Sequence, residues 1–206
     1  MRRYNSFFAI AAAVLVVACA GDNGPGAVDL PEAVVAGRLE HGTIRSIGAN
    51  TNAAITPGDD ATGIAYRSTL GFDLKALPSG ARVTSATLDV AQCQASANVF
   101  TALGPLVLDH IDLTLGLTDA AYSGQTLEPN IGTISSTTGT GSRTLDVTAA
   151  VQRDMTASRR VTAYRLRFRD HDTNGDAVAD FVQIALSRDQ HCTGQPDPRL
   201  HVSYDR

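Results

Sequence analysis

Tryptophan is absent from this chain of 206 residues, and only 5% of its residues are aromatic. Without tryptophan, the aromatic platform on which many proteins stack sugar rings is hard to build. Glutamate is scarce too, with Glu32, Glu40 and Glu128 as the only examples. Glycine, threonine, serine and aspartate are common instead, and this composition favours an all-β domain with polar loops over a helical one.

Sequence motifs of catalysis are also missing. The chain contains neither a GxSxG nucleophile elbow nor a glycine-rich phosphate loop, and no HExxH spacing occurs among its histidines. Asp109 and His110 are adjacent with Asp112 close by, but neighbouring residues of a strand point to opposite faces. A structural histidine at a sheet surface is therefore the favoured interpretation of His110, and we expect a non-catalytic protein.

Excess basic charge is absent, which argues against a nucleic-acid partner. The whole chain has a net charge of −4, from 17 basic and 21 acidic residues. Without Arg2 and Arg3, fifteen basic residues remain against the same 21 acidic ones, a net charge of −6. An acidic chain without a basic tail is not a generic binder of the phosphate backbone.

No hydrophobic run is long enough to span a bilayer. The apolar run at 7–17 has about 11 residues, whereas a membrane-spanning helix needs about 20. Arg2 and Arg3 precede this run. The residues at its end and just after it, Val16-Val17-Ala18-Cys19, match the pattern of a lipobox. We expect a signal peptide at 1–18 and lipidation of Cys19; the alternative is an ordinary secretory signal cleaved near Ala18 or Ala20.

Either signal exports the protein, and the cysteines agree with export. If Cys19 is lipidated, Cys93 and Cys192 remain as an even pair in an oxidising compartment, where a disulfide is expected. Two unrelated buried thiols are the alternative. Ala20 follows Cys19 where an aspartate would retain a Gram-negative lipoprotein at the inner membrane, so we expect an outer-membrane location in the bacterial envelope.

Strand patterns dominate the chain after residue 38. Apolar and polar residues alternate with a period of two in 66–74, 83–93, 107–115 and 161–169, as in strands with one buried face. Thr148 can cap a short helix that places Val151 and Met155 on one side. The sequence predicts a flexible tether at 19–37 and one all-β sandwich domain at 38–206, with a mostly looped stretch at 118–142.

An acidic loop follows the strand at 161–169. Oxygen-bearing side chains recur around a glycine turn, as a hard cation such as calcium requires. The candidate ligands are Asp170, Asp172, Asn174, Asp176 and Asp180. The spacing is similar to the DxDxDGxxD loops of thrombospondin type 3 and dockerin repeats, but no glutamate stands at the twelfth position. A solvated acidic hairpin loop is the alternative.

The same strand carries an arginine stripe of Arg165, Arg167 and Arg169 on its outward face. A guanidinium group binds a carboxylate in bidentate geometry, so the stripe could bind the carboxylates or sulfates of an anionic polysaccharide. The alternative is a solvated sheet face paired with aspartates of neighbouring strands, such as Asp89.

The run at 72–90, FDLKALPSGARVTSATLDV, resembles the signature of the bacterial DNRLRE, or disaggregatase-related, domains. Similar segments follow in the same order over roughly residues 41–206: 106–110, 130–134, 145–152, 165–168 and 198–204. The resemblance implies a jelly-roll-like β-sandwich related to carbohydrate-binding modules.

The resemblance also suggests a function: binding of a glycan or other cell-surface polymer. A structural or adhesive envelope protein without a small ligand is the first alternative, and a small polysaccharide-acting enzyme is the second.

Overall fold

The computed structural model describes residues 24–31, 34–35, 38–39, 42–45, 48–52, 54–113, 120–124, 126–186 and 190–206. The signal peptide expected at 1–18 and the lipidation expected at Cys19 lie outside the described residues.

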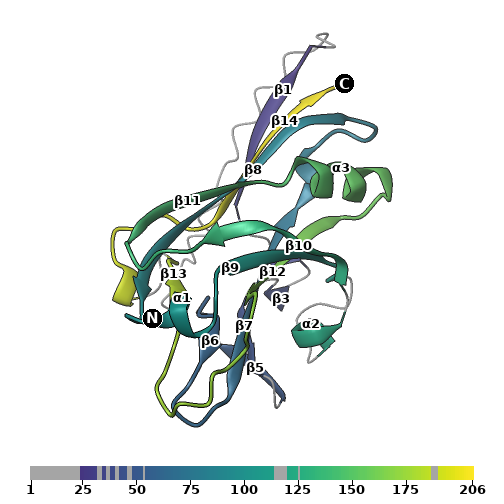
Figure 1. Ribbon diagram of the computed structural model, residues 1–206. Helices are drawn as coiled ribbons and strands as arrows, with labels where there is room; N and C mark the ends of the chain where they lie inside the picture. The colour runs from purple at the N-terminus through teal and green to yellow at the C-terminus, as the bar shows by residue number, and fades with distance from the viewer. Residues whose placement is uncertain are drawn as a thin grey trace, which may run out of the picture.

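Two antiparallel sheets make up the fold (Figure 1). In the first, sheet A, four strands lie side by side and a fifth pairs with the far half of β8. In order they are β1 (Gly26–Pro31), β14 (Arg199–Asp205), β8 (Arg82–Ala95) and β11 (Gly141–Asp146), with β13 (Val182–Ile184) as the fifth.

The second sheet, sheet B, faces sheet A. Its order is β10 (Thr126–Ser135), β9 (Leu106–Ile111), β12 (Val161–Phe168), β7 (Ala65–Asp73), β4 (Gly42–Arg45) and β5 (Gly48–Asn52). A short strand, β6 (Gly58–Asp59), pairs with the start of β7. Strands β2 (Val34–Val35) and β3 (Arg38–Leu39) form a separate pair.

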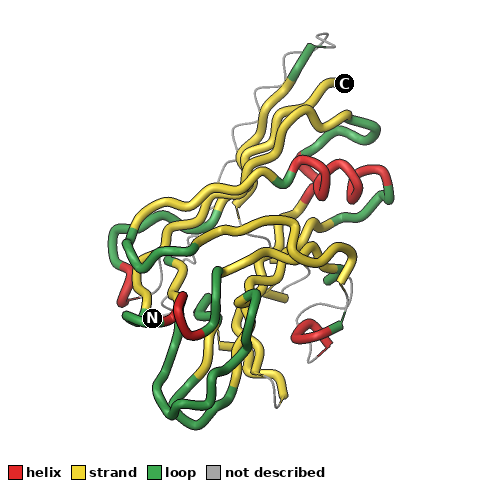
Figure 2. The backbone as a smooth tube through the Cα atoms, in the orientation of Figure 1, coloured by secondary structure: helices red, strands yellow, loops and turns green. Residues whose placement is uncertain are grey.

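Helical segments are short and lie between strands, as the tube in Figure 2 makes clear. The longest is α3 (Thr148–Thr156), which buries Val151 and packs against β8 and β12. The others are α1 (Val99–Ala102), α2 (Ala120–Ser123) and the 3₁₀ turns η1 (Leu74–Ala76) and η2 (Gln190–Cys192). The predicted fold class, an all-β sandwich with a short helix, is confirmed.

Alternate residues of the predicted strands meet in the core between the two sheets. The confirmed inward positions are Leu70 and Phe72 of β7, Ala86, Leu88 and Val90 of β8, and Tyr164, Leu166 and Phe168 of β12, all at most 3% exposed. Each fully buried large side chain contributes about 1.5–3 kcal/mol, so this layer provides most of the stability of the sandwich.

Strand β9 differs from the prediction in its phase. We expected Val107, Asp109 and Ile111 to face the core, but Leu106, Leu108 and His110 do so, and all six residues of β9 are buried. Ile111 joins a smaller apolar cluster on the outer face of sheet B, which α2 covers. Because both faces of β9 are buried, the alternation of polar and apolar residues does not show which face meets the core. The predicted inward face of this strand was therefore wrong.

Two segments expected to be irregular contain strands. Residues 26–31, assigned to the tether, form strand β1, which pairs along its whole length with β14. The stretch 118–142, expected to be mostly loop, contains β10 with its register shifts against β9. Residues 26–31 therefore belong to sheet A rather than to a flexible tether, and seven positions of the sequence lead from Cys19 to Gly26.

The predicted disulfide between Cys93 and Cys192 is present. It joins β8 to η2 across 99 positions of the sequence, on the outer face of sheet A, where Ala91 and Ala185 pack beside it.

Candidate binding site

A pocket of about 340 Å³ opens where the chain entering β7 meets the chain entering β13. Two loops far apart in the sequence lie side by side there, at the lower end of the molecule in Figure 2. The lining residues are Thr43, Thr56, Gly58, Asp59, Asp60, Tyr66, Ala179 and Phe181, and we call this the Tyr66–Phe181 pocket.

Gly58 allows the two walls of this pocket to approach each other. Its φ angle is 144°, and a Cβ atom there would lie 2.0 Å from the carbonyl oxygen of Asp180. The Asp59 amide donates to that same carbonyl at 2.7 Å, and the Val182 amide donates to the Pro57 carbonyl at 3.1 Å. Only glycine fits this close backbone contact, so the pocket depends on position 58.

Aromatic side chains supply the apolar part of the pocket. Tyr66 and Phe181 both line it and are partly exposed. Val178, one residue before Ala179 of the lining, is 57% exposed, the largest exposure of a big apolar side chain among the described residues. The sequence analysis found no aromatic platform because these two rings come from segments more than a hundred residues apart.

Asp60 supplies a fixed negative charge. The Thr62 hydroxyl donates to its Oδ1 at 2.6 Å, the amides of Thr62 and Ile64 donate to the same oxygen, and the Tyr66 hydroxyl donates to Oδ2 at 2.7 Å. The hydrogen bonds from Thr62 and Tyr66 lower the pKa of Asp60 well below its ordinary range. The carboxylate is therefore ionised at neutral pH and held rigidly at the rim.

The acidic loop is divided into two groups. Asp170 pairs with Arg169 at 2.8 Å, and Asp172 accepts two hydrogen bonds from Arg67 at 2.6 and 3.1 Å. Asn174 lies instead with Asp176 and Asp180, donating its side-chain amide to both at 2.8 and 3.3 Å. The five predicted calcium ligands thus do not converge on one point.

Asp59, which the sequence analysis did not single out, joins the second group. Its Oδ1 accepts the Asp180 amide at 2.9 Å and its Oδ2 accepts the Asn174 amide at 3.4 Å; Asp59 and Asp180 are 5% and 2% exposed. Within the described part of the chain, no three His, Cys, Asp or Glu residues are arranged as a metal-binding group. Asp59 lies 111 positions before Asp170, so only the folded chain could reveal it.

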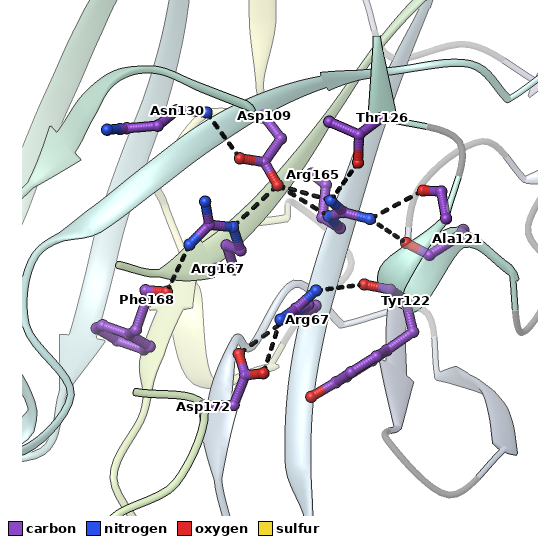
Figure 3. A network of polar contacts seen from close by, with 11 residues as sticks. Arg67, Asp109, Ala121, Tyr122, Thr126, Asn130, Arg165, Arg167, Phe168 and Asp172 are labelled. Carbon is purple, nitrogen blue, oxygen red and sulfur yellow. Dashed lines mark hydrogen bonds and ion pairs between the residues drawn. The ribbon is translucent and has the colours of Figure 1, made fainter. Parts of the chain in front are cut away.

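The arginine stripe is less uniform than expected (Figure 3). Arg165 is 3% exposed, because α2 and the residues after it cover that part of the sheet. All five of its N–H groups are used, by the Asp109 carboxylate twice and by the Ala121 carbonyl, the Gly124 carbonyl and the Thr126 hydroxyl. The expectation that Arg165 is solvent-facing is wrong, and it has no donor left for a ligand.

Arg167 and Arg169 keep some donor capacity. Arg167 donates to Asp109 at 2.9 Å and to the Phe168 carbonyl, and its side chain is 18% exposed. Arg169 is half exposed and pairs with Asp170. Asp109 thus pairs with two arginines, and its pKa is lowered: burial opposes ionisation, but hydrogen bonds from Arg167, the Asn130 amide and Arg165 outweigh it.

Arg67 links the acidic loop to α2. Besides Asp172, it donates to the Tyr122 carbonyl at 2.6 Å, and its guanidinium lies 4.4 Å from the centre of the Tyr122 ring. Burial and the nearby Asp172 raise the pKa of Tyr122 to about 12. These contacts of Arg67 and Arg165 hold α2 against sheet B. They form a structural network rather than an open binding face.

His110 lies on the other side of β9 from Asp109, as expected, but not at a sheet surface. It is fully buried, and its Nε2 lies 2.8 Å from Oδ2 of Asp154, which is also fully buried and accepts from Arg159 at 3.1 Å. Since no solvent or substrate reaches this pair, its position favours a structural role for His110.

A larger cavity of about 660 Å³ lies beside the first turn of α3. Its floor is apolar, with Val83, Ile131 and Val147, and its rim carries Glu128 and Asp146. It has no aromatic lining, which makes it a poorer site for a sugar ring than the Tyr66–Phe181 pocket.

Comparisons with known proteins leave the family open: no family model and no curated protein matched the chain. The resemblance to DNRLRE domains therefore stays a hypothesis. Among the described residues, no helix has the length and apolar character needed to cross a membrane.

Proposed function

We propose that this protein is a non-catalytic, exported and lipid-anchored module that binds a glycan through the Tyr66–Phe181 pocket. The observation that carries the proposal is the meeting of two partly exposed aromatic residues with a fixed carboxylate in one concavity. Aromatic rings pack against the apolar faces of sugars, and Asp60 can accept hydrogen bonds from sugar hydroxyls. The volume lies in the range of small-ligand sites, about 300–1,000 Å³.

The charge of the site favours a neutral glycan over an anionic one. Asp59 and Asp60 line the pocket, the Asp180 amide donates to Asp59, and the Asn174 side chain joins Asp176 to Asp180. Carboxylates or sulfates of a ligand would be repelled here. Of the arginines in the stripe that could attract them, Arg165 is saturated, Arg167 is largely covered and Arg169 is paired with Asp170.

Substitution of the pocket aromatic tests the proposal. Phe181→Ala is expected to weaken binding of a neutral oligosaccharide roughly fivefold, because a ring contact contributes about 1 kcal/mol. Binding is measured by calorimetry with hexasaccharides of cellulose, xylan and chitin, and with oligogalacturonate as the anionic comparison.

The matched control is Phe100→Ala, since Phe100 is partly buried, packs against Phe168 and is not among the residues that line the pocket. Thermal unfolding verifies that both variants fold. Equal affinities of the two variants, or a preference for oligogalacturonate, would count against the pocket. If no glycan binds at all, a structural or adhesive envelope role becomes the better account, whereas release of shortened products would favour an enzyme.

Calcium remains a proposal for the acidic loop, now with a revised ligand set. Asp59, Asn174, Asp176 and Asp180 would hold the ion only after their side chains move together, because they are not arranged as a metal-binding group in the described structure, and the Asn174 side-chain amide would rotate to present its oxygen. Calcium at 100 times its dissociation constant is expected to stabilise the fold by about 2.7 kcal/mol, a rise of several degrees in Tm that chelator reverses.

Two variants of the loop distinguish this ligand set from the original one. Asp176→Ala should abolish the calcium response, while Asp170→Ala should retain it, because Asp170 is paired with Arg169. If only Asp170→Ala loses the calcium-dependent rise in Tm, the ligand set predicted from the sequence is the correct one. If the natural protein shows no such rise, calcium binding is excluded.

A further inference from the structure

The spacer between the expected lipid anchor and the first strand is short. Cys19 and Gly26, where β1 begins, are seven residues apart. Whatever its conformation, this stretch reaches at most about 25 Å, since an extended chain covers about 3.5 Å per residue. If Cys19 carries the lipid, Gly26 must stay within that distance of the bilayer surface.

The Tyr66–Phe181 pocket lies at the opposite end of the sandwich from Gly26. Gly26 pairs with Tyr204, which pairs with Val83 near the start of β8. The last residue of β8, Ala95, pairs with Val182, next to the pocket. Strand β8 contains 14 residues, so about 40 Å of strand separates the two ends, at about 3.3 Å per residue.

The two lengths together exclude one orientation. A domain standing with its pocket against the bilayer would hold Gly26 about 40 Å above the surface, beyond the reach of about 25 Å. The domain must therefore lie flat or stand with its pocket away from the membrane.

Charge separates these two orientations. The end that carries Gly26 is close to neutral, since its basic residues are balanced by acidic ones: Lys75, Arg82, Arg153, Arg160 and Arg206 lie there with Asp29, Asp73, Glu128, Asp146 and Asp205. The pocket end is acidic, with Asp59, Asp60, Asp170, Asp172, Asp176 and Asp180 against Arg67 and Arg169. An anionic bilayer repels the acidic end, which a flat domain would bring to the surface and an upright domain holds away from it.

We infer that the anchored protein stands upright, with the end that carries Gly26 on the membrane, and presents the Tyr66–Phe181 pocket to a polymer some 40 Å beyond it. The inference rests on the proposed lipid anchor and names the partner of the proposed pocket. That partner is a glycan strand facing the membrane across the compartment, rather than a sugar headgroup of the anchoring leaflet.

Energy transfer to a labelled bilayer tests this orientation. The full lipidated protein is reconstituted in vesicles of 70% phosphatidylcholine and 30% phosphatidylglycerol with a headgroup acceptor. A donor dye is attached at Ser79→Cys, an exposed position at the end that carries Gly26, or at Val178→Cys beside the pocket. Transfer is expected to be several-fold more efficient from position 79.

A lengthened spacer provides the control. Twenty Gly and Ser residues inserted after Ala20 extend the reach by about 70 Å, so transfer from position 178 should rise. Equal transfer from both positions in the natural chain, or stronger transfer from 178, overturns the upright orientation. Failure to associate with vesicles overturns the anchor and the orientation together, yet leaves oligosaccharide binding by the unlipidated protein intact, so the two failures are distinguishable.

Discussion

Replacement of Asp109 by alanine is expected to lower the free energy of unfolding by about 3–5 kcal/mol. Asp109 is fully buried and accepts hydrogen bonds from Arg165, Arg167 and the Asn130 amide. Its removal leaves the buried Arg165 without a counter-charge and releases the contacts that hold the α2 segment. Urea unfolding followed by circular dichroism measures the change.

The control for this variant is Asp205→Ala, which removes an ion pair with Arg82 at the surface. Exposed pairs contribute about 0–1 kcal/mol, so the control should unfold close to the natural protein. Similar losses from the two variants would mean that the buried network does not anchor sheet B.

Low pH should remove the contribution of Asp109 to the free energy of unfolding. The pKa of Asp109 is lower in the folded protein than in the unfolded chain, so its contribution is complete above about pH 4 and is lost as the pH falls through the folded value. We expect the unfolding free energy of the natural protein to drop below about pH 4, and that of Asp109→Asn to drop less. Parallel pH profiles would exclude Asp109 as a source of acid sensitivity.

Loss of the disulfide is expected to cost about 4–5 kcal/mol, from the loop entropy of the 99-residue separation. The double variant Cys93→Ser/Cys192→Ser avoids a free thiol, and reductant on the natural protein provides an independent comparison. Both should lower the urea midpoint, with hydrogen exchange rising first in η2, which the bridge ties to β8. An unchanged midpoint after full reduction would show that packing around Ala91 and Ala185 suffices.

The alternation of polar and apolar residues in the sequence predicted those strands that bury only one face. Strands β7, β8 and β12 alternate clearly because their other faces meet solvent or polar side chains, and the helix at Thr148 was recognisable from its apolar spacing. Strand β9 was predicted in the wrong phase because α2 buries its second face, and β1 was not predicted because Gly and Pro bound a strand of only six residues.

The candidate site was harder to predict because it depends on contacts between distant segments. The sequence marks the acidic loop, but neither the pairing of Asp172 with Arg67 nor the arrival of Asp59 beside Asp180 has a local signal. The same holds for Tyr66 and Phe181. An arginine stripe likewise looks solvent-exposed until a covering segment, α2, is placed over it.

Chemical-shift mapping by NMR tests the central claim most directly. The isotope-labelled protein without residues 1–18 is titrated with the tightest-binding neutral hexasaccharide. We predict that the shifted amides cluster at Gly58–Asp59, Tyr66 and Phe181, at the acidic end of the sandwich. Shifts confined to the cavity beside α3, or to the arginines of β12, would contradict the assignment of glycan binding to the Tyr66–Phe181 pocket.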